Sequence, residues 1–348
     1  MKLLQNIILI TALCLALPTM AQKGPKQRKV KQETVKGFFD FVPDTINYRN
    51  GSRYIGGIVN DQLHGKGVLL SPYDDTLYVG EFQFGKKEGF GKYYFKNGNV
   101  YWGNWKDNHM DGEGRMTFLS GDVYDGDWIQ DRRHGKGEYV YADGSVYEGE
   151  FFEGIIQGRG QLVRDDMSYT GDWKNGLKHG RGYQVITSPD HYEEYRGDFL
   201  LGKYHGKGYW KHEKDGVVIE YQGNWRESRR FGEGMYRING REIKGYWQEN
   251  ECTGKGECST KDGGTYNGQF HRGFYQGDGT YTYKNGDVYK GAFIRGKKSG
   301  YGTMNYANGM VYEGMWYMDE PEGQGKLTYP DGKYVIGQFK QGKLEARQ

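Results

Sequence analysis

The sequence has few of the residues from which a thick globular core is built. Only 36% of its 348 residues are hydrophobic, although 16% are aromatic and 58 are glycine. A thin sheet whose neighbouring segments cover each other's rings needs little more than this. An excess of charge of one sign is also lacking, because 48 Lys and Arg face 45 Asp and Glu, for a net charge of +3. This balance disfavours nucleic acid as a partner.

What the chain has in abundance is a repeat of 23 residues. Each unit carries an aromatic residue, a glycine two residues on, a second aromatic after two more, and then a G-x-G about nine residues later. Two consecutive units show the pattern with Tyr101, Gly103, Trp105, Gly112 and Gly114, then Tyr124, Gly126, Trp128, Gly135 and Gly137. We count thirteen units, anchored on Gly56, Gly80, Gly103, Gly126, Gly149, Gly171, Gly197, Gly223, Gly245, Gly268, Gly291, Gly314 and Gly337. Fixed-period similarity predicts a repeat architecture.

Each unit has the signals of a β-hairpin. Large residues alternate with small or polar ones in Tyr147 to Phe151, as on a strand with one buried face. A turn rich in Gly, Asn and Lys follows, then a second strand and a second turn. We expect the second turn, at dipeptides such as Asp143-Gly144, to be of type I′. The glycines let an aromatic ring lie across the backbone, so the rings form the core. At ~4.8 Å per strand, thirteen hairpins would make a ribbon on the order of 120 Å long.

These residues resemble the MORN repeat, whose pattern is Y-x-G-x-[WF] followed by G-x-G. The resemblance covers residues 54–343, and it implies an elongated, solenoid-like ribbon of tandem antiparallel β-hairpins. It does not imply one activity, because MORN arrays are attached to proteins as different as lipid kinases and junctional membrane proteins.

The N-terminal region differs from the array. Residues 1–21 hold a short apolar run after Lys2 and small residues before Gln22, which predicts a cleavable export signal. The run is too short to span a membrane as a helix. Residues 22–36 form a basic leader, either a solvated linker or an arm that touches anionic lipid or a partner. We expect residues 37–53 to supply a capping strand, with Gly37 to Pro43 forming it, and residues 344–348 to be a polar tail. Export to the periplasm or cell envelope follows.

Few irregularities interrupt the repeat. The longer connections at 186–195 and 211–221 are the best candidates for loops with a specific function, although insertions without a function are commoner at hairpin tips. Cys252 and Cys258 lie six residues apart on one expected strand. Their Cα atoms would be ~20 Å apart, so we expect no intramolecular disulfide.

No catalytic, cofactor-binding or metal-binding set rises above the repeat background. Gly291 to Lys298 approaches a phosphate-binding loop, but the same shape recurs at the turn of another unit. Four histidines precede G-x-G in separate units, too far apart to share an ion: His64, His134, His179 and His205. Carboxylates such as Asp165, Asp166, Glu193 and Glu194 are expected at solvated hairpin tips. We therefore predict that the protein is not an enzyme.

One pattern outside the consensus suggests a contact surface. Basic pairs occupy the same place in four units, Lys86-Lys87, Arg132-Arg133, Arg229-Arg230 and Lys297-Lys298, while Ile155-Ile156 and Phe274-Tyr275 hold it in two others. On an exposed edge they could meet an anionic membrane or an acidic partner. Alternatively they are ordinary turn residues that discourage edge association.

These observations favour a non-enzymatic scaffold that binds a protein partner in the cell envelope. A peripheral membrane or phospholipid-binding protein is the alternative, and an enzyme is the third. Pairing of exposed strand edges would allow a homodimer.

Overall fold

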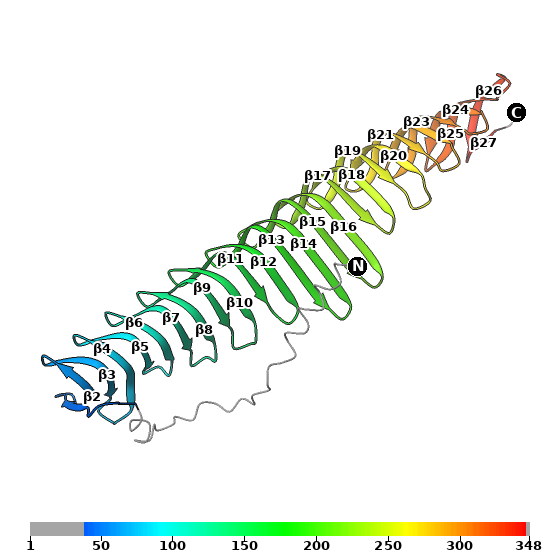
Figure 1. The fold of residues 1–348 in the computed structure, drawn as a ribbon. Helices are drawn as coiled ribbons and strands as arrows, with labels where there is room; N and C mark the ends of the chain where they lie inside the picture. The colour runs from blue at the N-terminus through cyan, green and yellow to red at the C-terminus, as the bar shows by residue number, and fades with distance from the viewer. Residues whose placement is uncertain (1–37, 346–348) are drawn as a thin grey trace, which may run out of the picture. The chain divides into compact units, whose positions relative to one another are not determined.

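The structure is a computed structural model that describes residues 38–345. Within them it is all-β, with 27 antiparallel strands and no helix (Figure 1). This confirms the predicted array of tandem antiparallel hairpins. The predicted export signal at 1–21 and the leader at 22–36 lie outside the described residues. The chain divides into two units, Met1–Tyr94 and Phe95–Gln348, and each is treated by itself.

The first unit contains five strands, each paired with the next. They are β1 (Asp44–Asn47), β2 (Arg53–Val59), β3 (Gln62–Leu70), β4 (Thr76–Gln83) and β5 (Lys86–Tyr94). The strand that covers the edge of β2 is therefore β1, which begins after Pro43. The expectation that the apolar run before Pro43 forms this strand is wrong for its described part. Phe39 instead packs edge-on against Phe38 and Phe41, with ring centroids 5.1 and 5.3 Å apart.

The second unit continues in chain order through 22 strands. They are β6 (Val100–Lys106), β7 (His109–Thr117), β8 (Val123–Ile129), β9 (Arg132–Val140), β10 (Val146–Phe152), β11 (Ile155–Val163), β12 (Met167–Lys174), β13 (Leu177–Ser188), β14 (His191–Leu200), β15 (Lys203–Lys214), β16 (Val217–Arg226), β17 (Arg229–Ile238), β18 (Arg241–Gln248), β19 (Glu251–Ser259), β20 (Thr265–His271), β21 (Phe274–Thr282), β22 (Val288–Ile294), β23 (Lys297–Asn305), β24 (Val311–Tyr317), β25 (Glu320–Thr328), β26 (Tyr334–Lys340) and β27 (Lys343–Leu344).

In each of the two units the core is a column of tyrosines on one face of the strands, which we call the inward face. Eleven of these tyrosines are at most 1% exposed: Tyr54, Tyr78, Tyr101, Tyr124, Tyr147, Tyr169, Tyr195, Tyr221, Tyr266, Tyr289 and Tyr312. The ring of Tyr124 lies over Gly137, where an added Cβ would come within 2.5 Å of it. Glycine is therefore required there, because the ring occupies the space of a side chain.

The column tyrosines also make ring contacts between neighbouring repeats, as Tyr124 does. Tyr124 packs edge-on against Trp128 of its own unit and Phe151 of the next, at centroid distances of 5.2 and 5.0 Å. The Tyr124 hydroxyl donates a hydrogen bond to the carbonyl of Asp127 (2.9 Å), and the Trp128 indole donates one to the carbonyl of Gly114 (2.9 Å). Both polar tips of these buried rings are thereby satisfied.

The two kinds of turn are the reverse of the prediction. Type I′ geometry, with both central residues at positive φ, occurs at the first turn, for example at Gln130 (48°) and Asp131 (66°). At Asp143-Gly144 only Gly144 has positive φ (89°). Asp143 instead accepts a hydrogen bond from the Ser145 amide (2.8 Å), which suits an Asx turn closed by glycine.

The connections expected to be loops at 186–195 and 211–221 are largely strand. β13 and β15 each contain 12 residues, and β14 and β16 contain 10. The register runs without a break to the tips, where Ser188 pairs with His191 and Lys214 pairs with Val217. The extra residues therefore extend the sheet and its inward face.

Candidate functional site: an acidic groove and its surroundings

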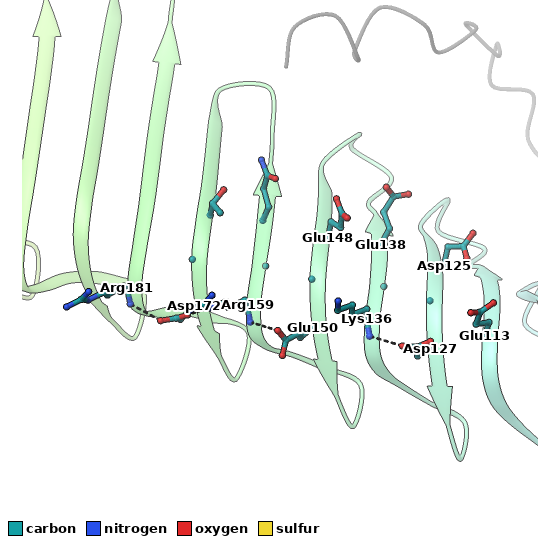
Figure 2. A pocket seen from close by; sticks show the side chains of 17 residues that line it. Glu113, Asp125, Asp127, Lys136, Glu138, Glu148, Glu150, Arg159, Asp172 and Arg181 are labelled. Carbon is teal, nitrogen blue, oxygen red and sulfur yellow. Dashed lines mark hydrogen bonds and ion pairs between the residues drawn. The ribbon is translucent and has the colours of Figure 1, made fainter. Parts of the chain in front are cut away.

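An open groove lies on the polar face of the sheet, opposite the tyrosine column, which we call the outer face. It spans β7 to β13, has a volume of about 1010 Å³, and is lined by seven carboxylates and three basic side chains. Figure 2 shows the charged residues on successive strands. The carboxylates are Glu113, Asp125, Asp127, Glu138, Glu148, Glu150 and Asp172, and the basic residues are Lys136, Arg159 and Arg181. The lining is therefore acidic.

Three of the carboxylates have a structural task. A bulge follows the first glycine in twelve of the thirteen repeat units, as between Gly126 and Trp128. The Asp127 side chain in this bulge accepts a hydrogen bond from the Lys136 amide (2.9 Å). Glu150 and Asp172 do the same for the amides of Arg159 and Arg181, at 3.3 and 3.0 Å (Figure 2). These acceptors satisfy backbone donors that the bulge leaves unpaired.

The other row of carboxylates has no such task. Asp125 of β8 lies directly opposite Glu138 of β9, and Glu138 lies directly opposite Glu148 of β10. Like charges in this register repel and destabilise a sheet. Asp125 has Arg115 as an ion partner at 3.3 Å. Among residues 38–345, neither Glu138 nor Glu148 forms an ion pair, so this row holds net negative charge.

Exposed apolar side chains border the groove on the side of the type I′ turns. Phe152 is 56% exposed and lies two residues beyond Glu150 on the same face of β10. Its ring packs on His134, with centroids 5.1 Å apart. Ile129, Ile155, Leu177, Leu200 and Leu201 are also exposed at successive turns of β8 to β14. The groove therefore combines an acidic floor with an apolar rim.

The basic pairs do not form the free basic edge that the sequence suggested, because alternation turns the second member of each pair inward. Arg133 pairs with Trp128 and lies over the rings of Tyr139 and Phe151, at 5.0 and 5.4 Å. Lys298 is 7% exposed and lies 4.3 Å from the Trp316 ring. Lys87 and Arg230 occupy the equivalent inward position opposite Phe82 and Trp225. These four cations belong to the core.

The first members are exposed, and three of them are paired across neighbouring turns. Arg132 contacts Glu153 at 3.4 Å, and Lys297 contacts Asp319 at 2.6 Å. Arg229 pairs with Glu249 in the same way. Lys86 lies exposed at the start of β5. The positive charge of this edge is thus largely neutralised by carboxylates one unit further along.

The two cysteines both lie on β19, as the register predicted, and both are buried with free thiols. The unit that carries the cysteines has Ile243 in place of the core tyrosine. Cys252 packs beside Gly245, where an added Cβ would lie 2.8 Å from its Sγ. Burial raises the pKa of the Cys252 thiol to about 11. The thiolate needed for reactivity is therefore scarce at neutral pH.

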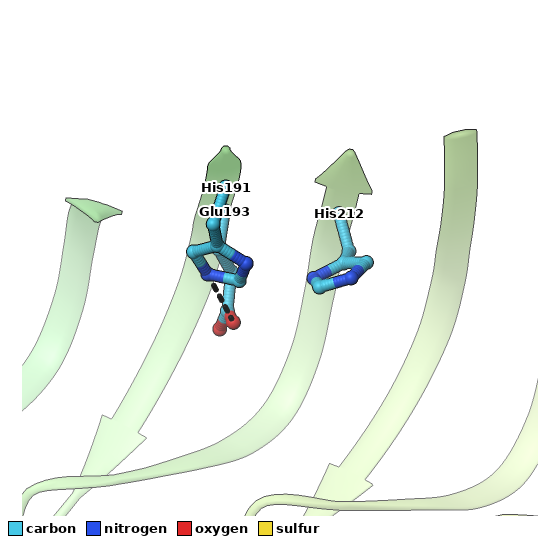
Figure 3. A group of neighbouring side chains, drawn as sticks. All are labelled: His191, Glu193 and His212. Atoms are coloured by element: carbon cyan, nitrogen blue, oxygen red, sulfur yellow. Dashed lines mark ion pairs between the residues drawn. The ribbon is translucent and has the colours of Figure 1, made fainter. Parts of the chain in front are cut away.

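Three potential metal ligands do meet in the lengthened strands. His191 and Glu193 of β14 and His212 of β15 place one donor atom each within 4.8 Å of one another (Figure 3). The sequence reasoning missed this group, because it placed Glu193 at a solvated hairpin tip and considered only histidines at equivalent repeat positions. The cross-strand register that pairs Glu193 with His212 is the signal that would have found it.

The hairpin array and the groove define an all-β repeat protein with a charged groove on its outer face. Twelve stretches of the chain match the MORN repeat, at residues 54–72, 78–100, 101–123, 124–146, 147–166, 169–185, 195–211, 221–240, 244–265, 266–288, 289–311 and 312–334. The chain belongs to the MORN repeat family. The thirteenth unit counted from the sequence, around Gly337, is outside these matches. MORN repeats are typical of repeat scaffolds and of membrane-binding proteins.

Other comparisons add little. No curated protein matches the chain. Solved structures that match include the TCP domain of Drosophila melanogaster SAS-4 in complex with a proline-rich motif, at 11% identity and a TM-score of 0.14, covering 93% of this chain and 99% of that one. A streptogramin B lyase has 11% identity and a TM-score of 0.12, covering 86% and 83%. Scores this low carry no argument. Among the described residues, no helix has the length and apolarity to cross a membrane.

Proposed function

We propose that the protein is a non-enzymatic scaffold of the cell envelope, and that it binds a basic, extended segment of a protein partner in the acidic groove. The observation that carries this is the cross-strand row of Asp125, Glu138 and Glu148. Folding gains nothing from like charges in direct register. Residues that oppose the stability of the fold in this way concentrate at functional sites.

The dimensions of the groove suit a short peptide segment. Seven strands at ~4.8 Å spacing give the groove a length of roughly 29 Å. An extended segment of about nine residues spans this distance. Its Lys and Arg side chains would neutralise Glu138 and Glu148, while apolar residues would cover Phe152 and Ile155 on the rim. Charge pairs of this type set both the rate and the specificity of association.

The envelope location rests on the export signal expected at 1–21. Membrane binding through the basic pairs receives less support, since Arg133, Arg230 and Lys298 lie within the aromatic core. Sedimentation with anionic vesicles distinguishes this alternative from the scaffold. The scaffold predicts that the protein stays in the supernatant.

The test is a matched pair of charge reversals. The groove variant is Glu138→Lys with Glu148→Lys. The control is Glu257→Lys with Glu313→Lys, which changes the same repeat positions in units that do not line the groove. Binding of a lysine-rich synthetic peptide is measured by fluorescence anisotropy, together with crosslinking of each variant in cells.

We expect the groove variant to bind the peptide at least about tenfold more weakly and to lose its crosslinked partner, with the control unchanged. Equal losses in both variants would show only a general charge effect, and unchanged binding by the groove variant would refute the proposed site.

A further inference from the structure

The lengthened strands carry a cluster of side chains that the repeat itself does not need. β13 to β16 extend the sheet beyond the level of Tyr195, and His191 and Glu193 precede this tyrosine at intervals of two residues. Residues at such intervals lie on one face of a strand. His212 of β15 stands directly opposite Glu193, and Trp210 stands opposite Tyr195. The group therefore extends the inward face past the tyrosine column.

The donor atoms of this group are close together and partly shielded from solvent. His191 Nε2 lies 3.8 Å from Glu193 Oε2, and their side chains are 28% and 21% exposed. The ring centroids of His191 and His212 are 4.8 Å apart, and the ring planes are inclined at 65° to each other. Trp210 stacks on the other side of the His212 ring, at 5.5 Å. Figure 3 shows the three side chains on two neighbouring strands.

The Glu193 carboxylate is held in place by a chain of hydrogen bonds. Its Oε1 accepts a hydrogen bond from the Tyr204 hydroxyl (3.0 Å). Tyr204 in turn accepts one from Gln184 Nε2 (3.0 Å), and Lys178 donates to the Gln184 carbonyl oxygen. One carboxylate oxygen is thus fixed by the protein, and the other faces His191. This is the arrangement by which outer partners orient a metal ligand.

We propose that His191, Glu193 and His212 bind one divalent transition-metal ion of borderline softness, with Zn²⁺ as the best match. Two imidazole nitrogens and one carboxylate oxygen form a known ligand set for zinc, which leaves a fourth position open to water. Ligand bonds of about 2.1 Å place tetrahedral donors about 3.4 Å apart. The three donor atoms now lie within 4.8 Å of one another. Rotation of the two histidine side chains would bring them to this shorter distance.

Space for a further ligand adjoins the cluster at Glu193. A cavity of about 380 Å³ adjoins the cluster and is lined by Glu193, Tyr204, Trp210, Ile219, Trp225 and Arg230 among others. A water molecule or a small anion can enter it and complete the coordination. The positive charge of the Arg230 side chain at this wall favours an anion.

Zinc binding by the purified full-length protein tests the proposal. The protein is treated with a chelator, dialysed, and titrated with ZnCl₂ by isothermal titration calorimetry at pH 7.5. We expect one ion per chain with a dissociation constant on the order of micromolar or tighter.

Substitutions separate this site from other histidines. His191→Ala, Glu193→Gln and His212→Ala should each weaken zinc binding at least about tenfold, and Tyr204→Phe should weaken it by about tenfold through the carboxylate it orients. The controls are His179→Ala and His205→Ala, which remove histidines of the repeat and should leave the affinity unchanged. Circular dichroism checks that each variant is folded.

Cobalt gives a second readout on the unaltered protein. Co²⁺ in a site of two nitrogens and one oxygen should produce visible absorption bands of a four- or five-coordinate ion, and zinc should displace it. Absence of both binding and bands at about 100 μM metal would overturn the proposal, since a built site binds well below this concentration. So would equal zinc affinity in the His212→Ala variant and the unaltered protein.

Discussion

The ordinary hairpin β8–β9 and the lengthened hairpin β14–β15 share one core but use their inward faces differently. Tyr124 and Tyr195 each cover a glycine of the following strand, and each donates to a carbonyl three residues on at 2.9 Å. At the position opposite the second aromatic, the ordinary hairpin has Arg133 and the lengthened hairpin has Tyr204. Arg133 contacts aromatic rings and donates a hydrogen bond to the Gly154 carbonyl, whereas the Tyr204 hydroxyl donates a hydrogen bond to Glu193.

This difference shows where the repeat leaves freedom. The tyrosine and glycine positions are fixed by steric contact, because any Cβ at Gly137 or Gly208 would overlap a ring. The residue opposite the second aromatic can vary widely, from Met110 to Arg133 to Cys252. Extra strand length adds inward positions that the core does not require. Those positions can carry a site.

The largest expected effect comes from removing a core ring in either kind of hairpin. Tyr124→Ala and Tyr195→Ala should each lower the free energy of unfolding by about 3–5 kcal/mol, because each leaves a cavity over a glycine. The corresponding Tyr→Phe controls should cost about 1 kcal/mol, the value of the lost hydrogen bond. Urea denaturation followed by tryptophan fluorescence measures both.

A much smaller cost for Tyr195→Ala than for Tyr124→Ala would break the comparison. It would mean that the lengthened hairpins are held by their added polar side chains and not by the shared column.

A smaller effect on stability is expected at the position opposite the second aromatic, where the two hairpins differ. Tyr204→Phe should cost about 1–3 kcal/mol, because Glu193 Oε1 and Gln184 Nε2 both lose the Tyr204 hydroxyl as a hydrogen-bond partner. Arg133→Met keeps the packing of the stem and loses one hydrogen bond to the Gly154 carbonyl (2.7 Å), so we expect about 0.5–1.5 kcal/mol. Urea denaturation of both variants checks the order, and a larger loss for Arg133→Met would reverse it.

The sequence was sufficient for the hairpin, the spacing of the rings and the role of the glycines, since each depends on local pattern and sterics. It failed at the turns because Asn-Gly and Asp-Gly fit two turn types, and only the observed φ values separate them. It also placed Arg133, Arg230 and Lys298 on the surface, although alternation from the neighbouring aromatic residue would have turned them inward.

The two candidate sites needed information beyond local pattern. The acidic row of Asp125, Glu138 and Glu148 appears only when the cross-strand register aligns three successive strands. The group of His191, Glu193 and His212 depends on strands that extend to two-residue turns, whereas the sequence suggested loops there. The register of a hairpin follows from its turn, and the two-residue turns that set it here were expected to be longer loops.

The account rests on the buried tyrosines as the core of the hairpin array, and alkaline titration tests this most directly. Burial raises the pKa of the column tyrosines, to about 12 for Tyr54, Tyr266 and Tyr312. Above pH 10 the unfolded chain releases protons that the folded chain retains. The stability that the protonated column tyrosines contribute is therefore fully present below pH 10 and is lost as the pH rises through about 12.

The measurement follows tyrosinate absorbance and the circular dichroism of the sheet on the same sample. We predict that the buried column tyrosines ionise in one step, together with loss of the sheet. Ionisation of all 31 tyrosines near pH 10 with the sheet still folded would contradict the account.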